Sequence, residues 1–128
     1  MKTPMNLLKL LALAIAAFGF SPVASAQVPV RILPLGDSIT EGYVVPAAVN
    51  GGYRKELHSL LTTQGYAVDY VGTLKYPDAV LEGWVDGDHE GRRGYKIDEI
   101  RSEAALWLKR VPNPDVILLH IGTNDFWA

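Results

Sequence analysis

The sequence predicts an α/β protein built on a parallel sheet. Three short runs rich in apolar residues, 30–35, 67–71 and 116–121, have the composition of strands, and a glycine follows each run. Between them lie two segments, 53–64 and 97–108, whose apolar residues recur at helical spacing. Strands of this kind alternating with amphipathic helices indicate a parallel sheet covered by helices on both faces.

The first strand and the first helix are separated by a loop. The strand Val30–Leu35 contains β-branched residues and stops at Gly36, and residues 39–52 are rich in turn formers. The helix predicted at Tyr53–Gln64 is followed by Gly65, a residue that commonly terminates helices. Its predicted apolar face consists of Tyr53, Leu57, Leu60 and Leu61.

The second half repeats the same order of elements. Residues Ala67–Val71 alternate apolar and polar side chains as a strand does, and residues 73–94 are predicted to form a long loop. A second helix is predicted at Ile97–Leu108, followed by a turn and the apolar strand Val116–Ile121. The predicted apolar face of this helix consists of Ile97, Ile100, Ala104 and Leu108.

The composition of the strands predicts their order in the sheet. Val30–Leu35 and Val116–Ile121 are the most uniformly apolar, so we expect them side by side at the centre. The more polar Ala67–Val71 is expected on the outer side of the first strand. This order reverses the winding of the sheet between the first and third strands, and ligands bind at such a point, outside the carboxyl ends of the strands.

The first 26 of the 128 residues are typical of a secretory signal peptide. Lys2 and Lys9 precede an apolar stretch, 10–20, and Ala24-Ser25-Ala26 forms a small-x-small cleavage site. We therefore expect a secreted protein, extracellular or periplasmic, whose folded domain is 27–128. The apolar stretch is short for a membrane anchor, and no membrane partner is expected after cleavage.

The amino-acid composition limits which partners and cofactors are expected. Residues 27–128 carry ten basic and fourteen acidic side chains, a balance that does not favour nucleic acid as a partner. The chain has no cysteine, which excludes disulfides and a lipid anchor on an N-terminal cysteine. No cluster has the spacing of metal ligands and no glycine-rich loop matches a phosphate site, so no cofactor is predicted.

Three residues are expected at the carboxyl edge of the sheet. Ser38 follows the first strand in "PLGDSITEG", Asn124 follows the third in "GTND", and Gly94 lies in the loop after the second. Each has an ordinary interpretation: Ser38 as a turn or helix-cap residue, Gly94 as a loop glycine, Asn124 as a cap. Their joint placement favours acyl transfer, with Ser38 as nucleophile. Its own N–H, the Gly94 N–H and the Asn124 amide would then bind the oxyanion.

At this point several blocks resemble a known family. The blocks "RILPLGDSITEG", "GGYRKEL", "DYVGTLK", "DHEGRRGYKIDEI" and "NPDVILLHIGTND" are similar to successive blocks of the SGNH (GDSL-type) hydrolases, most closely carbohydrate esterase family 3, the acetyl xylan esterases. The resemblance implies a flavodoxin-like three-layer α/β/α sandwich, C-terminally truncated here. It also implies metal-free serine esterase chemistry on acylated carbohydrate or another small ester. By motif, Ser38 would be the nucleophile, and Gly94 and Asn124 would complete the oxyanion hole.

The family pattern breaks at the general base. A serine needs a base to accept its proton, and the family's Asp-x-x-His block comes after "GTND", where this chain has only three more residues. Of the three histidines, His89 is a remote substitute, His58 a surface or boundary residue, and His120 a core residue of its strand. We therefore expect 27–128 to be the N-terminal part of an esterase domain that is inactive alone and exposes an apolar edge on its third strand.

Several readings stay open at this level. The alternatives to a polysaccharide esterase are a lipid or thioester acyl hydrolase on the same fold, and a non-catalytic incomplete fragment. Arg92 and Arg93 either contact substrate or form a solvated loop pair. Asp37 and Asp125 are expected to bind backbone N–H groups at a turn or helix start. The aromatic side chains that would either stack on a sugar or pack in the core are Trp84, Tyr95 and Trp127.

Overall fold

The computed structural model describes residues 27–42, 51–75, 86–111 and 113–127. Their elements are, in order, β1 (Val30–Gly36), α2 (Ser38–Glu41), α3 (Tyr53–Thr63), β2 (Val68–Tyr70), β3 (Leu74–Lys75), β4 (Asp88–Gly91), α4 (Ile97–Leu108), β5 (Val116–His120) and α5 (Thr123–Phe126). The expected signal peptide, 1–26, and Trp84 lie outside these residues. In the described residues no helix is long and apolar enough to cross a membrane.

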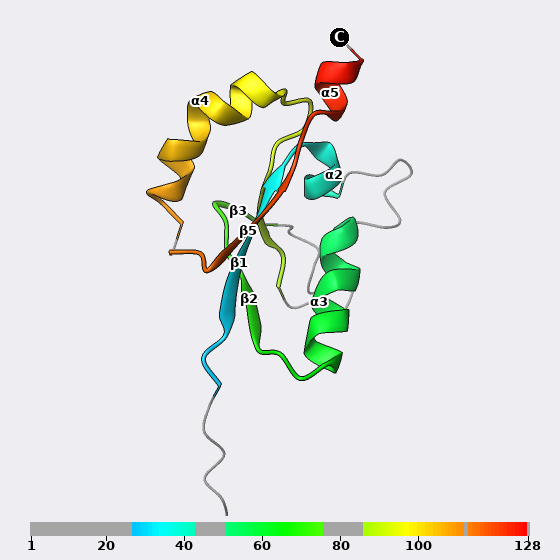
Figure 1. The fold of residues 1–128 in the computed structure, drawn as a ribbon, viewed down its shortest axis with the longest axis vertical. Helices are drawn as coiled ribbons and strands as arrows, with labels where there is room; N and C mark the ends of the chain where they lie inside the picture. The colour runs from blue at the N-terminus through cyan, green and yellow to red at the C-terminus, as the bar shows by residue number, and fades with distance from the viewer. Residues whose placement is uncertain (1–26, 43–50, 76–85, 112, 128) are drawn as a thin grey trace, which may run out of the picture.

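The three-layer α/β architecture is confirmed. Figure 1 shows the sheet between α4 on one side and α3 with α2 on the other. Alternation along β1 builds the two interfaces, because neighbouring strand residues point to opposite faces. Leu33, fully buried, packs with Ile100 and Trp107 on the α4 side. Ile32 packs with Tyr70 on the other side, together with the partly buried Leu61 of α3.

The predicted neighbours of β1 are confirmed, although β5, expected at the centre beside β1, is an edge strand among the described residues. β1 pairs in parallel with β5 over Ile32↔Val116 to Gly36↔His120, and with β2 on its other side over Val30↔Val68 to Ile32↔Tyr70. The two most apolar strands are therefore neighbours, and the shorter, more polar strand lies outside them. This arrangement follows from burial, since the central strand has neighbours on both edges and helices on both faces.

Pro34 stands in the middle of this central strand without interrupting it. The carbonyls of Ile32 and Gly36 accept bonds on the β2 and β4 side, from Val71 and Arg92, so Pro34 faces that side too. There β2 has ended at Tyr70, and the pairing of β4 with β1 begins only at Leu35↔Glu90. The missing N–H of proline therefore falls between two partner strands, where no ladder bond is needed.

The prediction of a loop over 73–94 is wrong in part. β4 pairs in parallel with the end of β1, and β3 pairs antiparallel with β4 over Leu74↔His89. "DHEG" lacks the apolar alternation that indicates a strand, yet its last three residues are buried because their polar groups have partners. For example, Glu90 is 0% exposed and its carboxylate binds Arg92 at 2.7 Å.

The helix boundaries were predicted closely, but the faces less well. α4 has the predicted bounds, yet its buried residues are Ile100 and Trp107, while Ile97 is 49% exposed. In α3, Leu60 is 59% exposed and Arg54 is fully buried instead. Residues 39–52 were expected as loop, whereas α2 occupies the first part of that segment.

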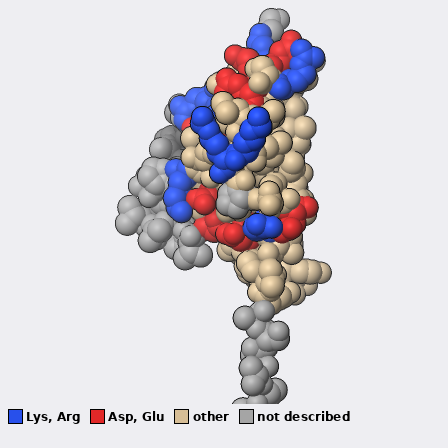
Figure 2. Space-filling view, turned by 90° about the vertical axis from the view of Figure 1, so that its left-hand side faces the viewer, with Lys and Arg blue, Asp and Glu red and all other residues tan. Residues whose placement is uncertain are grey.

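The surface is mixed in character. Figure 2, which looks onto the left-hand side of Figure 1, shows basic and acidic side chains interspersed over that face. On β5, Ile117 is 46% and Leu119 60% exposed, and within the described residues β1 is the one strand that pairs with β5. The expected exposed apolar edge on this strand is therefore confirmed.

Candidate active site

The candidate site lies at the carboxyl end of three paired strands. Gly36 of β1 is in register with Gly91 of β4 on one side and with His120 of β5 on the other. Ser38, Gly94 and Asn124 follow these three residues within a few positions. In Figure 1, α2, the start of α4 and α5 lie together at this upper end of the sheet.

Gly36 itself is required by close packing. A Cβ at this position would lie 2.0 Å from the His120 carbonyl oxygen and 2.5 Å from Thr40 Oγ1. Both distances are far inside van der Waals contact. The glycine before Asp37 and Ser38 therefore lets β5 and α2 approach the end of β1 closely.

Ser38 is the first residue of α2, and Asp37 is its N-cap. The Asp37 side chain accepts a hydrogen bond from the Ile39 N–H at 2.9 Å, as expected of that carboxylate. The cap interpretation of Ser38 is therefore wrong, because Asp37 takes that role. Among the described residues, no hydrogen bond joins the Ser38 hydroxyl or N–H to a partner. Ser38 is thus a partly buried residue at the start of a helix.

Gly94 lies in a tight turn between β4 and α4. The Tyr95 N–H donates to the Arg92 carbonyl at 3.2 Å, and Gly94 has φ of +79°. A positive φ at the third position of such a turn favours glycine. A Cβ there would meet no atom within 4 Å, so the backbone conformation rather than close packing favours glycine at this position.

Asn124 is held against this turn. Its Nδ2 donates to the Tyr95 carbonyl at 2.8 Å, which uses one amide hydrogen and leaves the second. The N-cap of α5 is Gly122, with φ of +113°, so the cap interpretation of Asn124 is wrong. The structure thus brings Asn124 and the Gly94 turn together.

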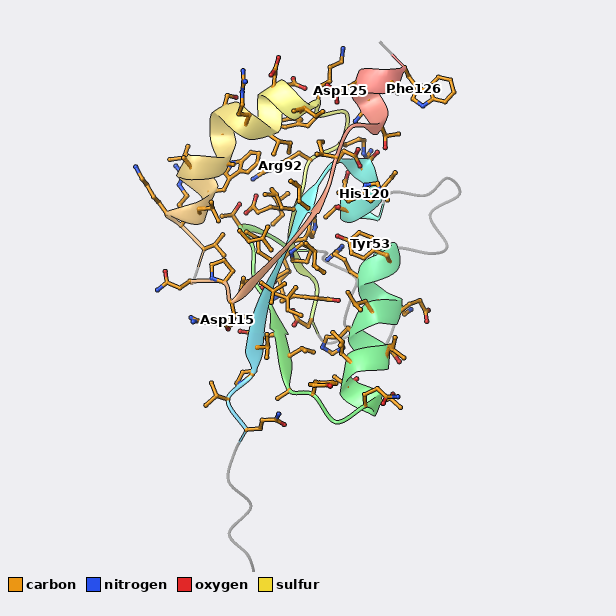
Figure 3. The ribbon with its side chains drawn as sticks, in the orientation of Figure 1. Tyr53, Arg92, Asp115, His120, Asp125 and Phe126 are labelled. Carbon is orange, nitrogen blue, oxygen red and sulfur yellow. The ribbon has the colours of Figure 1, made fainter. Side chains whose placement is uncertain are left out.

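Asp125 caps a different helix from the one expected. Its two carboxylate oxygens accept from the Ile97 N–H, at 3.1 and 3.3 Å, at the start of α4. We expected it to cap the helix that follows "GTND". This contact joins α5 to α4 beside the Asn124–Tyr95 bond, and Figure 3 labels Asp125 at that end of the molecule.

The two arginines before Gly94 are engaged within the protein. Arg92 binds the buried carboxylate of Glu90 and lies over the Trp107 ring, 4.7 Å from its centroid. Figure 3 shows Arg92 on the α4 side of the sheet. Arg93 binds both carboxylate oxygens of Glu41 at 2.8 and 3.1 Å. Both arginines therefore anchor the turn.

His89 is a structural residue of β4. It is 4% exposed, and its Nδ1 accepts from the Gly91 N–H at 3.0 Å. Burial, aided by the charges of Arg54 and Arg92, lowers the pKa of His89 to about 3. An imidazole this weakly basic and already hydrogen-bonded is poorly suited to accept a proton from Ser38.

The other two histidines differ in how far they match expectation. His58 is a boundary residue, as predicted, 4.0 Å from Asp86 and beside Tyr70. His120 was expected in the core, but it is exposed on β5. It lines a pocket of about 400 Å³ with Tyr53 and Leu57 of α3 and Ile117, Leu118 and Leu119 of β5. Figure 3 shows His120 and Tyr53 on the α3 side of the sheet.

The two described aromatic residues near the site differ in exposure. Tyr95 packs against the core beside Trp107, with ring centroids 6.2 Å apart. Trp127 is 79% exposed and meets the 80% exposed Phe126 edge to face at 5.3 Å. In the described residues, no group of three or more ionisable side chains could hold a metal ion.

Sequence reasoning missed one residue that organises the site, the buried Arg54 of α3. Its guanidinium donates to carbonyl oxygens of both α2 and the start of β4. The position of Arg54 did carry a signal. Leu57 lies one helical turn after it and Leu61 one turn further, so Arg54 is on the inward face of the helix. A cation at such a position is usually a solvated side chain, so the pattern alone did not reveal its burial.

Comparison with known proteins relates the chain to esterases. No family model matches the chain. A multidomain esterase of Ruminococcus flavefaciens is 35% identical over 140 aligned positions, covering 90% of this chain and 17% of that protein.

Solved structures extend the comparison to the fold. A family 3 carbohydrate esterase of Clostridium thermocellum matches with a TM-score of 0.68 and 40% identity, over 78% of this chain and 47% of that one. One from Talaromyces cellulolyticus matches with a TM-score of 0.58 and 30% identity, over 75% and 44%. An acetyl esterase mutant solved with an acetate ion is 29% identical, with a TM-score of 0.58.

The chain spans about half the length of these solved structures. Within that span the relatives are esterases, and the α/β fold is shared. The resemblance of this chain to the SGNH-type esterases of carbohydrate esterase family 3 is therefore confirmed.

Proposed function

We propose that Ser38 is the nucleophile of an esterase site that removes short acyl groups, acetyl above all, from polysaccharide. The observation that carries the proposal is the register at Gly36, which is paired with Gly91 on one side and His120 on the other. Ser38, Gly94 and Asn124 each follow one of these paired residues, so three separate segments supply chemistry at a single edge. The carbohydrate substrate rests on the family 3 relatives.

The proposed reaction is acyl transfer to serine. The Ser38 Oγ attacks the ester carbonyl carbon, its proton passes to a base, and the carbonyl oxygen becomes an oxyanion. The Ser38 N–H, the Gly94 N–H and the second amide hydrogen of Asn124 would donate to that oxyanion. Removal of one such donor lowers turnover about 10²–10³-fold in enzymes of this kind.

We propose further that none of the three histidines of this chain is the base. His89 is buried with its Nδ1 already accepting a bond, and His58 lies beside Asp86 and Tyr70. His120 lines the pocket with Tyr53 on the α3 side. Residues 27–128 are therefore expected to hold a nucleophile and oxyanion donors, with the proton acceptor supplied from elsewhere.

Chemical rescue tests both parts. Residues 27–128 and the Ser38→Ala variant are assayed on p-nitrophenyl acetate, with and without imidazole as an external base. We expect a rate that depends on Ser38 only when imidazole is present. A Ser38-dependent rate in buffer alone would show that the chain contains its base. Equal rates for the two proteins in imidazole would rule out Ser38 as nucleophile.

The same proteins separate the substrate classes. Acetate release from acetylated xylan is compared with hydrolysis of a long-chain p-nitrophenyl ester and of an acyl thioester. Faster turnover of acetylated xylan supports the polysaccharide substrate, whereas preference for a long chain or thioester supports the alternatives.

We also propose that residues 1–26 direct export. Their basic start, apolar stretch and Ala24-Ser25-Ala26 site support this assignment. N-terminal sequencing of the protein recovered outside the cytoplasm should begin at Gln27. Recovery in the cytoplasm with residues 1–26 intact would contradict it.

A further inference from the structure

Arg54 is a fully buried cation, which is unusual for an arginine. Its desolvation is offset by hydrogen bonds to backbone carbonyls, made through all three guanidinium nitrogens. Nε donates to Thr40 O at 2.8 Å and Nη2 to Glu41 O at 3.0 Å. Nη1 donates to Gly87 O at 3.0 Å and more weakly to Asp88 O at 3.4 Å.

These four carbonyls belong to two different elements. Thr40 and Glu41 are the last residues of α2, where helix carbonyls have no partner within the helix. Gly87 and Asp88 form the entry into β4. A single side chain from α3 therefore joins, through its planar guanidinium group, the end of α2 to the beginning of β4.

α2 depends on such external support because it has only four residues. A single helical turn is marginal in water, since nucleation costs more than the few hydrogen bonds return. At a rise of about 1.5 Å per residue, its last residue lies only about 5 Å along the axis from Ser38. A displacement of the carbonyl end of α2 is therefore transmitted directly to Ser38.

The far ends of the two joined elements carry the proposed chemistry. α2 begins with Ser38, and β4 runs into the turn that contains Gly94. We infer that Arg54 is a positioning residue, which sets Ser38 relative to the Gly94 N–H by tying α2 to β4. The inference rests on the proposed function, because it assigns Arg54 a task in that same site.

Two further contacts tie the same elements together nearer the surface. Arg93, just past β4, binds the Glu41 carboxylate through two hydrogen bonds. Gly91 lies against α2 so closely that a Cβ there would be 2.2 Å from the Glu41 nitrogen. Of the two arginines that join α2 to β4, Arg54 is the buried one, and its side chain binds backbone carbonyls on both sides of the contact.

The chemistry of the tie requires arginine. The guanidinium holds five N–H donors in a fixed planar fork, whereas a lysine ammonium is a point charge with three donors on one atom. Lysine at position 54 would keep the charge but could not span both elements in the same geometry. Although burial lowers the pKa of Arg54 to about 10, the group stays charged at neutral pH.

The experiment compares Arg54→Lys with Arg101→Lys in residues 27–128. Arg101 makes an exposed ion pair with Asp98 on α4 at 3.1 Å, which makes it a matched control. The first readout is the ¹H–¹⁵N spectrum, which needs no catalytic activity. We expect the amide resonances of 38–41 and 92–95 to shift in Arg54→Lys and to stay unchanged in Arg101→Lys.

The second readout is the Ser38-dependent hydrolysis of p-nitrophenyl acetate in imidazole. We expect kcat to fall at least 10-fold in Arg54→Lys, with KM within about twofold of the parent, because the lost alignment acts after binding. If the Arg54→Lys variant folds poorly, the Arg54→Gly variant replaces it in a rescue experiment. Added guanidinium at a concentration well below denaturing should restore its kcat by entering the vacated space.

The outcomes separate this inference from the function on which it rests. Unshifted resonances at 38–41 and 92–95, or a kcat within twofold of the parent, would overturn the role of Arg54. A parent chain without any Ser38-dependent rate would overturn the proposed function, and the resonances alone would then decide whether Arg54 ties α2 to β4. Shifted resonances with restoration by guanidinium would support the inference.

Discussion

Gly36→Ala is the sharpest test of how the carboxyl edge is packed. Gly36 does not have a positive φ, so alanine is not strained there by its backbone. Without a clash, Gly→Ala at such a position stabilises a protein by about 0.4–1 kcal/mol through the unfolded state. A new Cβ would, however, lie 2.0 Å from the His120 carbonyl oxygen, which is backbone and cannot rotate away.

The size of the effect follows from what must move. β1 and β5 have to separate by more than an ångström to accept the Cβ, and overpacking of this kind costs about 1–3 kcal/mol. The long bond from the Asp37 N–H to His120 O, 3.4 Å, would be lost as well, at about 0.5–1.5 kcal/mol. These losses amount to about 1.5–4.5 kcal/mol. Against the entropic gain, we expect a net loss of roughly 0.5–4 kcal/mol in the free energy of unfolding.

Urea denaturation followed by circular dichroism measures this loss, and amide hydrogen exchange locates it. Exchange should accelerate along β5, from Val116 to His120, more than in α3. Gly65→Ala is the control: Gly65 has φ of +87° and open space around it, so its variant should lose stability from backbone strain without faster exchange in β5. A Gly36→Ala protein as stable as its parent would refute the packing argument.

Two further predictions concern buried polar groups. The pKa of His89 is lowered to about 3 in the folded protein, from an ordinary value of 6.5. Between these two pH values the unfolded chain binds more protons than the folded one. The free energy of unfolding should therefore fall as the pH drops below about 6.5, by at most about 1.4 kcal/mol per pH unit. His89→Asn, which keeps an acceptor for the Gly91 N–H, should flatten that slope in urea titrations at pH 4–7, and an unchanged slope would contradict the assignment. Arg92→Met should cost about 3–5 kcal/mol because it removes the charged partner of the fully buried Glu90 carboxylate. Glu90→Gln combined with Arg92→Met should recover part of that loss in the same denaturation assay. A double variant no more stable than Arg92→Met alone would contradict the stabilising role of the Glu90–Arg92 ion pair.

Much of the fold could be predicted because it follows from the pattern of apolar residues. The bounds of α4 and the neighbouring positions of β1 and β5 required only periodicity and composition. β4 could not be found in this way, since its residues are polar and are stabilised by partners distant in the sequence. Glu90, for example, accepts a hydrogen bond from the N–H of Thr73, 17 residues earlier in the chain.

The candidate site shows the same division. Ser38, Gly94 and Asn124 could be assigned to one edge, because the carboxyl ends of parallel strands share an edge. The partners of the polar side chains could not be assigned. Asp125 was expected to cap the helix that follows "GTND", but its carboxylate binds the Ile97 N–H at the start of α4. A capping carboxylate contacts the N–H group that tertiary packing brings to it.

The sequence by itself determined the parallel α/β architecture, the order of its main strands and the edge at which Ser38 lies, because periodicity and composition are local properties. Only the tertiary structure decided that Arg54 is buried between α2 and β4, that β4 pairs with β1, and that His120 lines a pocket. A polar or charged side chain is stable inside a protein only when other groups supply its hydrogen bonds. Where those groups lie far along the chain, as for Arg54, no local pattern specifies them.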